Sequence, residues 1–292
     1  MEQPKQITET GGRFLVTPIT DTNIFTREDF TEEQREIQEM VQGFCKEHIA
    51  PVKEELEKKD KDLTFSLLQK IAELGLLGIT VPEEYGGMEL DKITGAIVAE
   101  ASSYSECSSF VVTWSTNLGI GSLPIIWFGS PAQKEKYLPR LIDGTCIGAY
   151  GLTEPSAGSD ALSAKTTAVL SDDGKHYILN GEKIFITNGI HADLVIVAAI
   201  TDPGKGAKGT SLFLVDAHSP GFEKSKKIDK IGQHTSDTAL LFFNDVRLPA
   251  DALLGEENRG FVIMMEELPR ERLGIAAQAV AASDVERDRL GG

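Results

Sequence analysis

The sequence predicts an α+β protein with an N-terminal helical bundle, a central antiparallel β-barrel or sandwich domain and the start of a truncated C-terminal helical domain. Three changes of pattern support this fold class. Residues 28–146 carry apolar side chains at helical spacing, residues 147–256 consist of β-rich runs separated by Gly, Pro and Asp, and residues 257–292 return to helical spacing. A polar, extended lead over residues 1–27 is expected to lie on the surface.

The first predicted helix begins at Thr31, because Thr31 and Gln34 have the spacing of a capping box. Apolar and aromatic residues then follow at helical spacing at Ile37, Met40, Val41, Phe44 and His48. Ser130 followed by Pro131 indicates a second helix start. Further helices are expected over Ser66–Leu74, Leu90–Ser103 and Ser130–Leu141, with a loop over residues 78–87.

The central part of the chain predicts strands. Tyr177–Thr187 contains two β-rich runs joined by Asn180 and Gly181, which is the strongest short signal for a hairpin. Further strands are expected over Leu194–Ile200, Ser211–Val215 and Leu240–Val246, and a helix interrupted by Pro269 over Gly260–Ala282.

Composition excludes several classes of protein. The chain has 292 residues, 41% of them hydrophobic, and a net charge of −16, which argues against nucleic acid or an anionic membrane as the main partner. We expect no membrane span, signal peptide or transit sequence, and reduced cysteines in a cytoplasmic protein. The five histidines and three cysteines lack the spacing of a metal site, so no metal is expected.

Two short runs carry the functional information. The run over residues 150–160 combines glycines with the hydroxyls of Thr153, Ser156 and Ser159, and the run over residues 182–189 places Phe185 and Thr187 two positions apart. Backbone amides and hydroxyls can meet a polar ring or phosphate, and an aromatic side chain can lie on a flavin. The alternatives are an ordinary surface loop for the first run and plain core for Phe185.

In residue identities, order and spacing, both runs resemble the motifs of the acyl-CoA dehydrogenase family. The resemblance extends from about Asp29 to Ser283. It implies FAD as cofactor and the dehydrogenation of a fatty acyl-CoA thioester to the trans-2-enoyl-CoA, as in fatty acid β-oxidation. It also implies a cofactor-binding set of Tyr150, Leu152, Thr153, Ser159, Phe185 and Thr187. Ser159 would reach toward the cofactor phosphate or CoA.

The implied reaction requires a base for the α proton, and Glu271 is the candidate. Some branches of the family carry the catalytic glutamate on this helix immediately before an arginine, which matches Glu271 and Arg272. Arg272 could orient the thioester end. The alternative is an exposed, charged helix face in which Glu267, Arg270, Glu271 and Arg272 are solvated or paired.

The family normally continues beyond this point to complete a C-terminal bundle that contributes to the FAD site and the oligomer contact. The resemblance implies electron-transfer flavoprotein as electron acceptor and a homodimer or homotetramer if that bundle is present. Two alternatives stay open: a catalytically incomplete scaffold with weak or no flavin binding, and an oxidase of the same fold. Acyl chain length and branching are not specified by the sequence.

Overall fold

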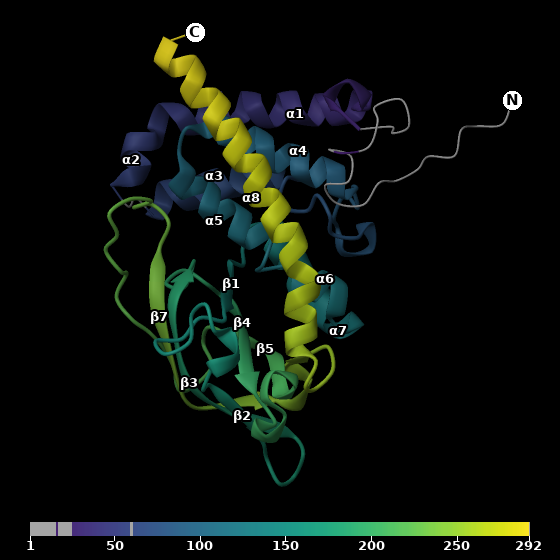
Figure 1. Ribbon diagram of the computed structural model, residues 1–292, viewed down its shortest axis with the longest axis vertical. Helices are drawn as coiled ribbons and strands as arrows, with labels where there is room; N and C mark the ends of the chain where they lie inside the picture. Colours follow the sequence, from purple (N-terminus) through teal and green to yellow (C-terminus); the bar gives the residue numbers. More distant parts are fainter. Residues whose placement is uncertain (1–15, 17–24, 59–60, 292) are drawn as a thin grey trace, which may run out of the picture.

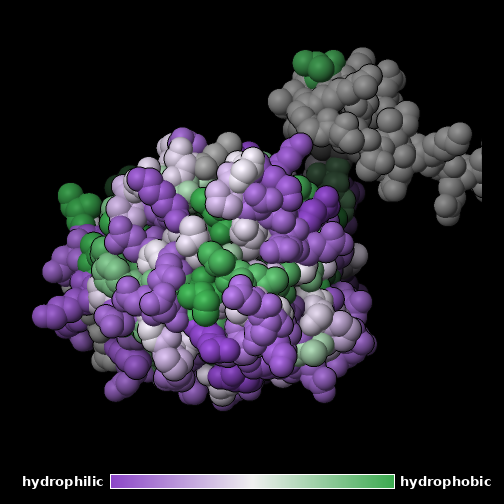
Figure 2. Space-filling view, turned by 90° about the horizontal axis from the view of Figure 1, so that it is seen from below, coloured by the Kyte–Doolittle hydropathy of each residue, from purple (hydrophilic) through white to green (hydrophobic). Residues whose placement is uncertain are grey.

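The computed structural model describes residue 16 and residues 25–58 and 61–291, so most of the predicted lead lies outside the described residues. A helical domain and a sheet domain lie one above the other, and the long helix α8 runs from the sheet domain across the helical domain (Figure 1). The end formed by the sheet domain presents a mostly hydrophilic face with a small hydrophobic cluster near its centre (Figure 2). The predicted order of helices, sheet and helix is confirmed.

Seven α-helices of the described residues precede the sheet, and short 3₁₀ or π turns separate some of them. The helices are α1 Glu32–Phe44, α2 Lys53–Glu57, α3 Lys61–Glu73, α4 Lys92–Ser102, α5 Ser108–Leu118, α6 Leu123–Phe128 and α7 Pro131–Ile142. The short turns before the sheet are Arg27–Asp29, Cys45–Ile49, Ala50–Val52, Glu83–Tyr85 and Ser103–Ser105.

The capping boxes predicted at Thr31 and Ser130 are confirmed, and both hydroxyls accept a hydrogen bond from the backbone three residues on. α3 begins at Lys61 rather than at Ser66. α5 and α6 are additional helices for which the sequence analysis proposed none.

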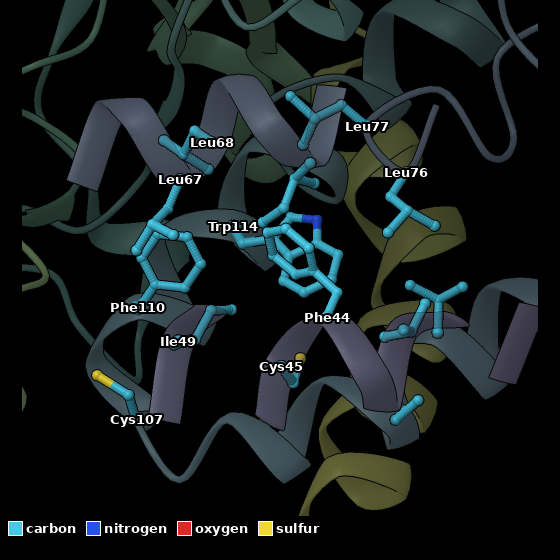
Figure 3. Packing of buried hydrophobic residues seen from close by; sticks show 14 of the residues in the cluster. Phe44, Cys45, Ile49, Leu67, Leu68, Leu76, Leu77, Cys107, Phe110 and Trp114 are labelled. Carbon is cyan, nitrogen blue, oxygen red and sulfur yellow. The ribbon is translucent and has the colours of Figure 1, made fainter. Parts of the chain in front are cut away.

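The core of the helical domain forms around Trp114 and Phe110 of α5. Both side chains are almost completely buried, and α1, α3 and the segment after α3 pack around them. Figure 3 shows this packing for Phe44, Cys45, Ile49, Leu67, Leu68, Leu76, Leu77, Cys107, Phe110 and Trp114. The three cysteines of the chain are free and buried, and Cys45 and Cys107 belong to this cluster.

The segment Ser108–Phe128, which contains α5 and α6, is by length and composition alone apolar enough to cross a membrane. Most of this segment is buried inside the protein. Its apolar character is therefore accounted for by its position in the core.

The sheet contains eight strands among the described residues. They are β1 Gly148–Gly151, β2 Thr167–Leu170, β3 His176–Thr187, β4 Leu194–Ile200, β5 Thr210–Asp216, β6 Phe222–Lys224, β7 Thr238–Pro249 and β8 Leu253–Leu254. Their order is β6-β7-β3-β2-β4-β5-β8, with β1 paired to β4. β1 and β2 run parallel to β4, so the sheet is mixed rather than purely antiparallel.

The hairpin predicted at Asn180 and Gly181 is wrong, because β3 continues through both residues and pairs with β2 and β7. The register against β7 shifts between Leu179 and Gly181, and Gly181 has a φ of 145°. A Cβ atom at Gly181 would lie 2.5 Å from Oγ1 of Thr166. The glycine therefore serves a β-bulge and a close approach of two strands rather than a turn.

β4 is buried on both faces, which explains its uninterrupted apolar sequence. Val195 and Val197 pack with side chains of β3 and β7 on one side. Leu194 and Ile196 pack with side chains of α6 and α7 on the other side. This second interface places the sheet beside α6 and α7.

α8 spans Gly260–Gly291 and continues through Pro269 without the predicted interruption. Ile263 and Met264 are buried before the proline, and Ala281 is buried after it. The Oγ of Ser103 donates a hydrogen bond of 3.0 Å to the carbonyl of Gln278. Packing on both sides of the proline therefore holds the two halves as one helix.

Candidate functional site

A cavity of about 580 Å³ lies between the first predicted run, the end of β3 and the first half of α8. It is lined by all six predicted cofactor-binding residues: Tyr150, Leu152, Thr153, Ser159, Phe185 and Thr187. Two runs that are well separated in sequence thus line one cavity.

A second cavity of about 350 Å³ lies between α4, α5, α6 and α8, and its wall is mainly apolar. Small side chains of α4 form one side, including Gly95, Ala96 and Ala99. Trp114 and Leu118 of α5 also line this cavity. A narrow hydrocarbon chain fits a wall of this kind.

Glu271 lines both cavities. Burial raises the pKa of its carboxyl, and the neighbouring Arg270 opposes this rise. The carboxylate lies over Gly119, where a Cβ atom would be 3.1 Å from Oε1 and 3.2 Å from Oε2. The turn that ends α5 thus leaves room for the carboxylate where the two cavities meet.

The arginine that lies in a cavity beside Glu271 is Arg270, and not Arg272 as predicted. Arg272 is exposed and is not among the residues that line either cavity. Arg270 lines the apolar cavity instead, with its guanidinium 5.8 Å from the ring centroid of Trp127. Burial lowers the pKa of Arg270, although Glu271 opposes this effect. The expected role of Arg272 at the thioester is thus not supported by its position.

A buried ion pair fixes the loop that carries Leu152 and Thr153. Nζ of Lys183 lies 2.7 Å from Oε1 of Glu154, and both side chains are almost completely buried. The same ammonium group donates to the carbonyl of Leu152. Burial would raise the pKa of Glu154, but hydrogen bonds from Lys183 and Thr166 hold it below its usual value. The first run is therefore braced from β3 rather than being a free surface loop.

Phe185 reaches the site through a distortion of β3 rather than through simple alternation. The register with β7 shifts between Lys183 and Ile186, and Phe185 has a φ of 60°. Its side chain is 63% exposed, so it is not part of the core. An aromatic residue with a left-handed backbone conformation is uncommon, and its position on the wall of a cavity indicates that function constrains the backbone there.

Family models match most of the described chain. Residues 31–145 match the N-terminal domain of acyl-CoA dehydrogenases and residues 149–246 match the middle domain. The butyryl-CoA dehydrogenase structure from Megasphaera elsdenii has a TM-score of 0.80 and 41% identity, over 89% of this chain and 67% of that chain. The chain belongs to the acyl-CoA dehydrogenase family.

Two further similarities show the extent of the match. The long-chain specific acyl-CoA dehydrogenase of Rattus norvegicus is 44% identical over 90% of this chain and 60% of that protein. The crystal structure of a Bacillus anthracis acyl-CoA dehydrogenase complexed with FAD has a TM-score of 0.86 and 43% identity, over 93% of this chain and 46% of that chain. The chain thus spans about half to two thirds of the length of these relatives.

This acyl-CoA dehydrogenase family member also contains a buried acid that the sequence analysis treated only as part of a charged face. Glu267 is 4% exposed, lines the larger cavity and has a pKa raised to about 8, chiefly by burial and also by Glu271 and Glu266. The spacing of four residues between Glu267 and Glu271 could have indicated that both share one helix face. No sequence pattern indicated that Gly119 would lie against the carboxylate of Glu271.

The segment over residues 232–238 joins the two domains of this family member. The backbone N–H of His234 donates to Oε2 of Glu57 at 2.9 Å. Nζ of Lys224 donates to the carbonyls of Ile190 and Ala192. These contacts give this segment and Lys224 a structural role.

Proposed function

We propose that this chain forms the catalytic part of an FAD-dependent acyl-CoA dehydrogenase that converts a fatty acyl-CoA thioester to the trans-2-enoyl-CoA. The observation that carries this proposal is the position of Glu271, whose carboxyl group lines both the cofactor-side cavity and the apolar cavity. A base at such a junction can reach a thioester carbon while the hydrocarbon chain lies in the apolar cavity.

The residues of the larger cavity fit a flavin. The exposed ring of Phe185 offers an aromatic face, and Thr153 and Thr187 offer hydroxyls at the same wall. The buried hydroxyl of Tyr150 has no hydrogen-bond partner among the described residues, so it can serve a bound polar edge. Bound FAD supplies the acceptor for the hydride that leaves the β carbon.

The chain's own residues would perform the remaining steps. Glu271 accepts the α proton, and its raised pKa makes it a better proton acceptor than an exposed carboxylate. The walls of the apolar cavity exclude water from the hydrocarbon chain. We further propose electron-transfer flavoprotein as the electron acceptor, a homo-oligomeric assembly and a cytoplasmic location, on the basis of the family relationship.

The test is absorbance spectroscopy of the purified protein. After reconstitution with FAD, the protein should be yellow, and an acyl-CoA added without oxygen should bleach the flavin band. Glu271→Gln should keep the flavin bound but lower the bleaching rate by about 100-fold to 10,000-fold, because the general base is lost.

The matched control is Glu286→Gln, an exposed glutamate of the same helix that pairs with Arg289. This variant should bleach at the wild-type rate. Protein that stays colourless would instead support the incomplete scaffold, and undiminished bleaching by Glu271→Gln would refute the assignment of the base. Rapid reoxidation of the bleached flavin by oxygen would support an oxidase.

A further inference from the structure

Two buried polar groups near the proposed base lack partners. Oε1 of Glu267 and the hydroxyl of Tyr150 are both buried without a hydrogen-bond partner among the described residues. Both residues line the same cavity as Glu271. A buried polar atom without a partner is costly, so its retention on the wall of a cavity calls for a functional reason.

Glu267 and Glu271 lie one helical turn apart on α8 and therefore project on the same side. Both carboxyl groups have a raised pKa for which burial is the main cause, and Glu271 contributes to the rise at Glu267. The other titratable group that influences Glu267 is the exposed Glu266 on the same helix, and Glu267 in turn raises the pKa of Tyr150 on β1. Arg270 acts on Glu271.

We propose that Glu267 and Glu271 form a carboxyl pair that holds one proton, in which Glu267 stays neutral while Glu271 carries the charge and acts as the base. This inference rests on the proposed function. Glu267 acts through Glu271 and is a positioning residue rather than a catalytic one. Two buried carboxyl groups one helical turn apart on the wall of the larger cavity cannot both ionise readily, so their protons leave in two separate steps.

The proton balance explains how the pair helps the reaction. When the α C–H bond breaks, its electron pair stays on the substrate and a new O–H bond forms on Glu271. The pair then holds two protons and no charge, and the negative charge has moved from the carboxyl pair to the substrate, which would pass it on with the hydride that leaves the β carbon. If Glu267 ionised as well, its charge would repel the negative charge that develops on the substrate.

The decisive experiment is infrared spectroscopy of the pure protein, without flavin or substrate, over a pH titration. The carbonyl band of a protonated carboxyl group should persist at neutral pH and disappear near pH 8. Glu267→Gln should remove this band. Glu271→Gln should shift its disappearance to lower pH, because the neighbouring charge is gone. Glu266→Gln, which changes an exposed neighbour, should retain the band.

The proposal is overturned if Glu267→Gln leaves the neutral-pH band in place, or if Glu271→Gln leaves its midpoint unchanged. These outcomes do not depend on flavin binding or turnover, so they are distinguishable from a failure of the proposed function.

The pH profile of bleaching gives a second readout. The wild-type rate should rise as Glu271 ionises and fall as Glu267 ionises, and Glu267→Gln should lose the alkaline fall while retaining the acidic rise.

Discussion

Gly119 shows how one missing side chain shapes the site. Its ψ of −109° belongs to neither helix nor strand, and its position at the end of α5 leaves room for the carboxylate of Glu271. A Cβ atom here would also lie 2.8 Å from the carbonyl oxygen of Ser115. A methyl group at this position therefore has to displace either the backbone or the base.

Gly119→Ala should lower the rate of flavin bleaching by up to about 100-fold, because a small displacement of a base is costly. It should also lower the free energy of unfolding by about 1–3 kcal/mol. Urea unfolding and anaerobic bleaching measure the two effects. Gly43→Ala is the control, because a Cβ atom at Gly43 in α1 meets no atom within 4 Å. A Gly119→Ala variant that bleaches at the wild-type rate would show that the base has freedom to move.

At the scale of elements, the Lys183–Glu154 pair connects β3 to the loop of the cofactor-side cavity. Lys183→Met should destabilise the protein by about 3–5 kcal/mol, because it leaves a buried carboxylate without its cation. The double variant Lys183→Met/Glu154→Gln should lose less free energy of unfolding than the sum of the two single variants. Denaturant unfolding of the four proteins measures this coupling. Strictly additive losses would contradict the assigned role of the pair.

The sequence predicts those elements whose signals are local. Thr31 and Ser130 cap helices because a capping box needs only residues within one turn. The hairpin prediction at Gly181 is wrong because the role of this glycine depends on its close approach to Thr166, which lies on a neighbouring segment of the chain. The cofactor-side residues could be predicted from two short runs, whereas the burial of Glu267 depends on how α8 packs on α6 and β5, which periodicity does not specify.

For the whole molecule, electrostatics is the dominant large-scale property. The chain has 45 acidic and 29 basic residues, so its folded surface repels itself. Sodium chloride should therefore raise the urea midpoint from low to physiological ionic strength without a change in m-value, because salt screens this repulsion. A lower midpoint at higher salt would show instead that exposed pairs such as Lys136–Asp216, 3.0 Å apart, dominate.

The apolar segment Ser108–Phe128 has a consequence for synthesis of the protein. α5 is held from the sheet side by residues that come later in the chain: the N–H of Gly148 donates to Oδ1 of Asn117, and Nδ2 of Asn188 donates to the carbonyl of Thr113. The ribosome therefore synthesises this segment before the strands that cover it. Until Asn188 has been synthesised, this apolar segment stays exposed on the nascent chain, and a chaperone that binds exposed apolar segments can protect it during this interval.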